Sequence, residues 1–217
     1  MNFPYNLDFS KKLVIDTEKL NWQPSSKLGV ERKVLERESA ESGRATSIVR
    51  YAPGALFSEH IHPNGEEIFV LSGEFRDENG VYPKGTYLKS ARGSRHSPSS
   101  ESGCTLFVKL GHIKESNSAS CVIFTDKTAW LPGLGDLKVM PLDDHLGKHT
   151  ALVLWPKGAR HMPHSHYGGE EMLVLEGTLH DEYGIYSSGT WIRSPHLSSH
   201  QPYTDSGCLI LVSVGHL

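Results

Sequence analysis

Several features that mark other classes of protein are scarce or missing in this sequence. Its 217 residues include only three cysteines, Cys104, Cys121 and Cys208, and no two of them form a Cys-x-x-Cys pair. A sparse, odd set of thiols suits a reducing cytoplasm better than a disulfide framework. No uncharged apolar run approaches the roughly 18 residues of a transmembrane helix, and the N-terminal segment carries Asp8 and lacks the apolar core of a signal peptide. We therefore expect a cytoplasmic protein with no membrane partner.

An excess of charge of one sign is also missing. The chain has 22 basic and 25 acidic residues, a net charge of −3, which provides no electrostatic attraction for nucleic acid. No G-x4-G-K-[ST] loop or G-x-S-x-G elbow occurs, so neither a phosphate-binding loop nor a serine hydrolase is indicated. Histidine, in contrast, occurs 13 times. The chemistry of this protein is therefore sought in its histidines.

The sequence repeats itself. Residues 51–113 align without a gap on residues 155–217, and 26 of the 63 aligned positions are identical. A match of this length indicates two copies of one structural unit. We place the boundary in the Ser-rich stretch near residue 117, which gives an N-terminal barrel with an extended arm at 1–117 and a C-terminal barrel at 118–217.

Each repeat has the sequence pattern of short strands. Apolar runs of strand length alternate with Gly-rich turns, and Asp77–Gly80 and Asp181–Gly184 have the composition of hairpin turns. Val30–Glu38 has some helical character, but the corresponding segment of the second repeat contains Pro141, so we predict strands for both. The expected fold is all-β, with two antiparallel barrels in tandem.

A histidine pattern occurs once in each repeat. G-x5-H-x-H-x3-E-x6-G is found at 54–73 and at 158–177, and a third histidine follows each copy. Two histidines at i and i+2 of a strand project from the same face, and a tight turn can bring the glutamate level with them. Three imidazoles and a carboxylate suit Zn, Fe, Ni, Cu or Mn. The candidate metal ligands are His60, His62, Glu66 and His96 in the first repeat, and His164, His166, Glu170 and His200 in the second.

Some assignments around this pattern stay open. Glu67 and Glu171 directly follow the chosen glutamates and compete with them, although the spacing to the next glycine favours Glu66 and Glu170. His112 and His216 end the last strand of each repeat, and we predict surface or packing roles for them. His161 is out of phase with the pattern and is predicted to point away from the barrel interior.

These residues resemble the two motifs of the cupin superfamily. The first cupin motif, G-x5-H-x-H-x3,4-E-x6-G, is complete in both repeats, whereas the second differs at some positions, including Leu197 in place of its glycine. The segments at 70–86 and 174–190 are similar to the cupin domain of the anti-sigma factor ChrR. The resemblance implies two double-stranded β-helix (jelly-roll) barrels, each binding one divalent metal ion through the four candidate ligands, with zinc or iron as the expected metal.

The resemblance implies two kinds of function. In the first, the chain is a ChrR-like, stress-linked sensory or regulatory protein; residues 1–50 contain no cysteine or histidine, so we expect no helical, zinc-binding sigma-factor module there. In the second, it is an Fe(II)-dependent dioxygenase that cleaves a diketone or an aromatic ketone. A small molecule in either barrel and a regulatory protein partner are compatible with the sequence, and whether the chain is an enzyme or an oligomer stays open.

Overall fold

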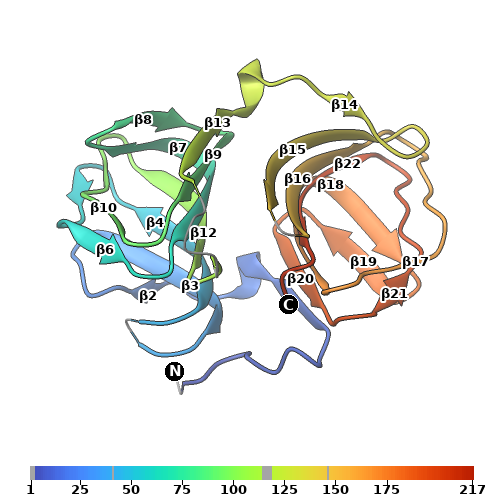
Figure 1. Ribbon diagram of the computed structural model, residues 1–217, viewed down its shortest axis with the longest axis horizontal. Coiled ribbons are helices and arrows are strands. Elements are labelled where there is room, and N and C mark those ends of the chain that lie inside the picture. Colours follow the sequence, from blue (N-terminus) through green and yellow to red (C-terminus); the bar gives the residue numbers. More distant parts are fainter. Residues whose placement is uncertain (1–2, 41, 114–118, 146) are drawn as a thin grey trace. The chain divides into compact units, whose positions relative to one another are not determined.

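The computed structural model describes residues 3–40, 42–113, 119–145 and 147–217, which fold into two compact units (Figure 1). The first unit consists of the chain up to Leu7 and Leu20–Lys127, and the second of Asp8–Lys19 and Thr128–Leu217. Apart from two 3-10 turns, η1 (Thr17–Lys19) and η2 (Thr125–Lys127), the regular structure of the described residues is all strand. No helix in this part of the chain is long and apolar enough to cross a membrane. The predicted all-β class is confirmed.

The first unit is a barrel built from one large antiparallel sheet and a small ribbon. The order in the large sheet is β13-β9-β7-β12-β4-β3-β2, with β8 and β11 paired to β7 and β5 paired to β11, while β6 and β10 form the ribbon. The strands of this unit are β2 (Gln23–Pro24), β3 (Val30–Arg37), β4 (Ala45–Tyr51), β5 (Ala55–Leu56), β6 (His60–His62), β7 (Glu66–Asp77), β8 (Gly80–Pro83), β9 (Thr86–Ser90), β10 (Ser94–His96), β11 (Ser99–Ser100), β12 (Cys104–Leu110) and β13 (Cys121–Phe124).

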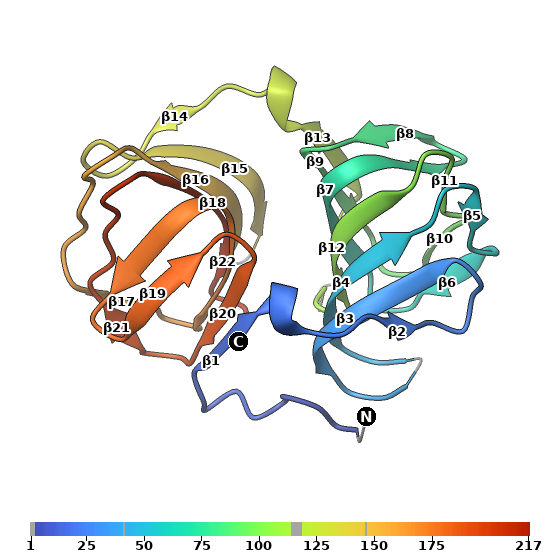
Figure 2. The same cartoon turned by 180° about the vertical axis from the view of Figure 1, so that it is seen from behind.

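The second unit repeats this arrangement (Figure 2). Its large sheet has the order β1-β20-β18-β22-β16-β15-β14, with β19 paired to β18, and β17 and β21 form its ribbon. The strands of this unit are β1 (Leu13–Asp16), β14 (Leu131–Pro132), β15 (Lys138–His145), β16 (Lys148–Trp155), β17 (His164–Ser165), β18 (Glu170–Asp181), β19 (Gly184–Ser187), β20 (Thr190–Ser194), β21 (Ser199–His200) and β22 (Cys208–Val214). The two tandem barrels expected from the repeat are both present.

The segment that combined helical and strand character is extended in both units. β3 and β15 each form an antiparallel pair with the following strand and contain a register shift, at Val34/Glu36 and at Pro141/Asp143. Pro141 lies at this bulge, where a residue without a backbone N–H is tolerated in a sheet. The strand prediction for both segments is confirmed.

The first strand of each repeat pairs with the sheet of the other repeat's barrel. β1 pairs with β20 from Leu13↔Arg193 to Asp16↔Thr190, and β13 pairs with β9 from Cys121↔Lys89 to Phe124↔Thr86. The sequences of these two arms, LVIDTEK at 13–19 and CVIFTDK at 121–127, correspond to each other. Each compact unit therefore contains the arm that precedes the other repeat. The predicted boundary at residues 117 and 118 lies outside the described residues.

A hydrophobic core lines the interior of each barrel. In the first unit Val70 and Leu106, both at most 1% exposed, pack with Phe75 and the surrounding apolar residues. In the second, Val174 and Ile210 occupy the corresponding positions. Burial of these aliphatic side chains stabilises each barrel by about 1.5–3 kcal/mol per residue, so the barrel walls are firm enough to hold polar groups in place.

Candidate metal centres

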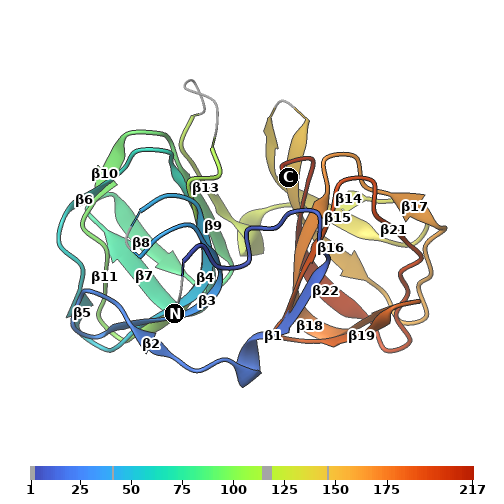
Figure 3. The ribbon, with the colours of Figure 1, turned by 90° about the horizontal axis from the view of Figure 1, so that it is seen from below.

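Three histidines of the first unit converge on one point. In the ribbon of β6 and β10 (Figure 3), His60 is paired with His96. His60 and His62 project from one face of β6 because side chains alternate along a strand, and His96 joins them from β10. The Nε2 atoms of His62 and His96 are 2.9 Å apart, and the three ring centres are 4.6–5.0 Å from one another. This is the grouping of imidazoles that the sequence predicted.

Glu66 adds a carboxylate to this group from the start of β7. Its Oε2 lies 3.4 Å from Nε2 of His62 and 3.4 Å from Nε2 of His96. The turn before it requires Gly65, because φ is +70° there and a Cβ would come within 2.5 Å of Ile113 Cδ1. Among the described residues, the buried Oε2 of Glu66 has no hydrogen-bond partner. A buried carboxylate oxygen of this kind, facing imidazole nitrogens, fits a bound cation.

The second unit contains the same arrangement. His164 on β17 is paired with His200 on β21, and His166 follows just after β17. The Nε2 atoms of His166 and His200 are 3.0 Å apart, and Glu170 places its Oε1 3.5 Å from the first and its Oε2 3.7 Å from the second. Glu170 Oε2, like its counterpart, is buried without a hydrogen-bond partner among the described residues. All eight predicted ligands therefore lie in two groups of four.

The turn before His200 keeps its shape although Leu197 replaces glycine. Leu197 has φ of +61°, close to the +76° of the corresponding Gly93, and its N–H donates to the carbonyl of His166 at 2.9 Å. Gly93 makes the same bond to His62, at 2.8 Å. A left-handed conformation costs a leucine about 1–2 kcal/mol. The second unit thus holds a strained residue in the conformation that brings His200 to the cluster.

The competing glutamates point to the other side of the sheet. Glu67 accepts a hydrogen bond from the hydroxyl of Tyr87 at 2.9 Å, and Glu171 accepts one from Nε1 of Trp191 at 3.0 Å. Adjacent residues of a strand face opposite sides, so only one glutamate of each pair can face the histidines. The geometry favours Glu66 and Glu170 as ligands.

Burial sets the protonation of both clusters. It lowers the pKa of His62 to about 3, aided by repulsion from His96 and His60, and lowers that of His166 to about 4. The same burial raises the pKa of Glu66 and that of Glu170 to about 7. These two imidazoles are therefore neutral at physiological pH, which is the form that coordinates a metal.

Asp77 holds His96 in the first unit, a role that the sequence did not reveal. Its Oδ2 lies 3.6 Å from Nδ1 of His96, while its Oδ1 accepts from the hydroxyl of Tyr82 at 2.9 Å. Burial opposes the charged form of His96, but the bond and the attraction from Asp77, with that from Glu66, raise its pKa. A carboxylate behind a ligand histidine fixes the orientation of the ring. The signal for this role was the recurrence of the Asp-Glu-x-Gly sequence in both repeats.

Asp181 holds His200 in the second unit, with help from the N-terminal arm. Its Oδ2 lies 3.5 Å from Nδ1 of His200, and Oδ1 accepts from Tyr186 at 2.7 Å. Lys12, just before β1, places Nζ 3.2 Å from the same Oδ2. The second centre therefore depends on a residue of the arm that precedes the first repeat.

Three further histidines lie outside the ligand sets. His112 and His216 are buried, so of the two roles predicted for them they take the packing role: the first lies 3.3 Å from Thr46 Oγ1, and the second hydrogen-bonds Glu171 at 2.9 Å. The prediction for His161 is wrong, because its ring centre lies 4.4 Å from that of His164. Its Nδ1 bonds the next residue's carbonyl, which turns the ring toward the cluster against the alternation assumed for a regular strand.

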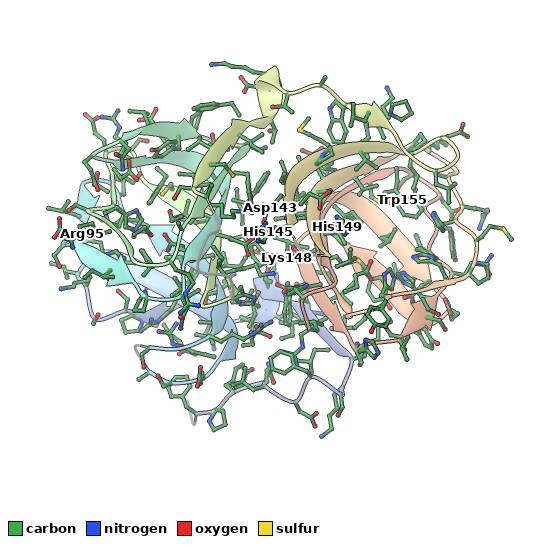
Figure 4. All side chains as sticks on the ribbon, in the orientation of Figure 1. Arg95, Asp143, His145, Lys148, His149 and Trp155 are labelled. Carbon is green, nitrogen blue, oxygen red and sulfur yellow. The ribbon has the colours of Figure 1, made fainter. Side chains whose placement is uncertain are left out.

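The first unit encloses a cavity of about 430 Å³ beside its histidines. All four candidate ligands line it, together with apolar residues such as Tyr51 and Ile68. A volume of this size is in the range of small-molecule pockets. In the second unit, the larger Trp155 (labelled in Figure 4) stands at the position of Tyr51, and Met172 stands at the position of Ile68. Both side chains are buried.

The raised carboxyl pKa values predict the pH dependence of metal binding. A metal requires the carboxylate, so binding at pH 7 should release protons from Glu66 and Glu170, and affinity should fall as pH drops below about 7. The neutral His62 and His166 should contribute no protons until much lower pH, in contrast to an ordinary histidine with its pKa near 6.5. Calorimetric titrations in buffers of different ionisation enthalpy count the protons. Release of none between pH 6 and 7 would contradict this electrostatic picture.

Comparisons with known proteins identify the family and the fold. The model of the family described as the ChrR Cupin-like domain matches the chain twice, at residues 10–114 and 118–217. No curated protein gives a significant match in sequence.

Solved structures share the whole two-barrel architecture. A "putative dioxygenase" from Nostoc punctiforme superposes with a TM-score of 0.80 at 16% identity, covering 94% of this chain and 82% of that one. Oxalate decarboxylase from Lactobacillus farciminis gives 0.68 at 14% identity, with coverages of 94% and 86%. A cupin 2 conserved barrel domain protein from Leptotrichia buccalis gives 0.65 at 13% identity, with coverages of 97% and 99%. At these identities the likeness shows a common fold alone.

Proposed function

Because this chain belongs to the ChrR cupin-like family, with one domain in each half, we propose that it is a cytoplasmic, stress-linked regulatory protein that binds one divalent transition metal ion in each barrel. The observation that carries the proposal is the twofold occurrence of three clustered imidazoles with a buried, unpaired carboxylate oxygen. Such a protein would bind a small molecule in one of its barrels or a regulatory partner protein.

The proposed ligands in the first barrel are His60, His62, Glu66 and His96, and their equivalents serve in the second. A bound zinc or iron ion supplies Lewis acidity and, for iron, redox chemistry. The chain itself keeps His62 neutral through burial, and Asp77 orients His96 from behind. The donor set of nitrogen and one oxygen anion fits both metals.

A second candidate function is an Fe(II)-dependent dioxygenase acting on a diketone or an aromatic ketone. The cavity in the first barrel favours it, because a small molecule there would lie against His60, His62 and His96. Four protein ligands leave two positions on an octahedral iron for a substrate and oxygen, whereas the same four around zinc form a closed tetrahedron.

The metal and its coordination distinguish the two functions. We expect protein purified without added metal to hold zinc with four ligands by X-ray absorption spectroscopy, and to consume no oxygen with pentane-2,4-dione. A six-coordinate iron with stoichiometric oxygen uptake on addition of the diketone would refute the regulatory assignment and establish the oxygenase.

A further inference from the structure

The cavity of the first barrel has a polar side on β3 and β4, which are separated from β7 in the order of the sheet. Three residues of these strands line the cavity. Arg32 on β3 pairs with Val49 on β4, and Ser47 lies two residues before Val49 on β4. Glu66 is on β7, which is separated from β3 by β12 and β4. At about 4.8 Å per strand, Arg32 is roughly 14 Å from β7 along the curved sheet. Arg32 and Glu66 therefore line the cavity from different strands of the sheet.

Ser47 supplies an unsatisfied polar group on this side of the cavity. Its side chain lines the cavity and is buried, at 4% exposure, and its Oγ has no hydrogen-bond partner among the described residues. Buried hydroxyls are nearly always hydrogen-bonded in proteins, so an unpaired one that faces a cavity indicates a missing partner. A ligand oxygen would provide that partner.

The charge of the cavity favours an anion. Arg32 and Arg37 both line it, and Glu66 is the one acidic residue among the described residues of its wall. A divalent metal at the histidines would more than neutralise Glu66, so the remaining charged side chains of the wall would be the two arginines. Guanidinium groups bind carboxylates through paired, charge-assisted hydrogen bonds. The remaining wall is largely apolar, with residues such as Phe57, Val108 and Leu110.

The second barrel lacks this set of groups. In the repeat and the strand pairing, Val139 stands where Arg32 is, since Val139 pairs with Val153 as Arg32 pairs with Val49. Ala151 replaces Ser47, and Asp144 replaces Arg37. The two barrels have thus kept the same candidate metal ligands but differ at these three positions.

We propose that the first barrel binds a small organic acid whose oxygen donors reach the metal and whose carboxylate is held by Arg32 and Ser47, and that the second barrel does not bind it. The proposal rests on the proposed metal site at His60, His62, Glu66 and His96. It applies equally to a sensed ligand and to a substrate, because it concerns recognition and not turnover.

A diketone with a carboxylate tail provides a direct probe. 4,6-Dioxoheptanoate carries both groups, and its methyl ester lacks the charge and adds one methyl group. Calorimetry on the metal-loaded protein should show one binding site per chain for the acid and weaker binding of the ester. Arg32→Val introduces the residue of the second barrel at this position. It should weaken binding of the acid about tenfold or more and leave the affinity for the ester unchanged, as expected for loss of a charged hydrogen bond.

Further variants distinguish loss of the carboxylate contact from misfolding of the barrel. Arg32→Lys retains the charge and should bind the acid with intermediate affinity, Ser47→Ala should weaken it by a smaller factor, and Val139→Ala in the second barrel should have no effect. Metal content and melting temperature report on the fold of each variant. Equal affinity of the acid for wild type and Arg32→Val, or no binding to protein that holds two metal ions, would overturn the carboxylate proposal alone. A first barrel that takes up no metal would overturn this proposal together with the proposed function.

Discussion

Replacement of His62 by alanine should lower the metal content from two ions per chain to one. The substitution removes one of four ligands from the first cluster, and its Nε2 lies 2.9 Å from that of His96 and 3.4 Å from the Glu66 carboxylate, at the centre of the group. Loss of residues that merely support metal ligands already weakens binding 10- to 100-fold, so loss of a ligand should weaken it by about 100-fold or more. Elemental analysis after dialysis measures the change.

The equivalent change in the second barrel should act independently. His166→Ala should also leave one ion per chain, and the double variant should hold none, because the two clusters share no ligand. His149→Ala is a matched control, since this histidine is exposed and belongs to neither cluster. If one of the two single variants retained the wild-type content, only one barrel would be a functional metal site.

Removal of residues 1–19 should destabilise the second unit more than the first. The deletion takes away β1, which pairs with β20 along its four residues, and Lys12, which bonds the Asp181 carboxylate behind His200. The loss of half-buried Leu13 and Ile15, of buried Thr17 and of this ion pair should cost about 2–4 kcal/mol. We expect a separate unfolding transition at lower temperature and weaker metal binding at the second site.

A shorter deletion provides the control. Removal of residues 1–7 leaves β1 and Lys12 in place, and takes away only contacts with the first unit, such as the bridge of Tyr5 with Arg37 and the bond from Asn6 to the Leu35 carbonyl. This shorter deletion should leave the unfolding transition of the second unit at its wild-type temperature. Identical melting curves for the two deletions would show that the arm does not stabilise the second barrel.

The sequence predicted the barrels and the grouping of the ligands because both depend on local rules. Strand alternation places His60 and His62 on one face, and the glycine turn fixes where Glu66 lies, so spacing alone brings them together. Both the strand pattern and the ligand spacing occur in each of the two repeats, which supports each prediction twice. The choice between Glu66 and Glu67 needed the structure, because spacing favours one of them but only the side-chain contacts show which faces the histidines.

Other features depend on contacts between residues distant in sequence and had no local signal. The pairing of β1 with β20 joins positions 13–16 to 190–193, and no periodicity within either segment specifies the partner. The same holds for Lys12 and Asp181. Arg32 was part of a segment of mixed helical and strand character, and its place in the cavity follows only from the register of β3 on β4.

The count of metal ions in the intact, wild-type chain shows whether each barrel is a metal centre. Native mass spectrometry of the folded protein, after saturation with zinc and removal of excess, should give a mass that corresponds to two ions per chain, with a one-ion species only at substoichiometric zinc. A chain that saturates with one ion, or with none, would contradict the assignment of a metal centre to each barrel.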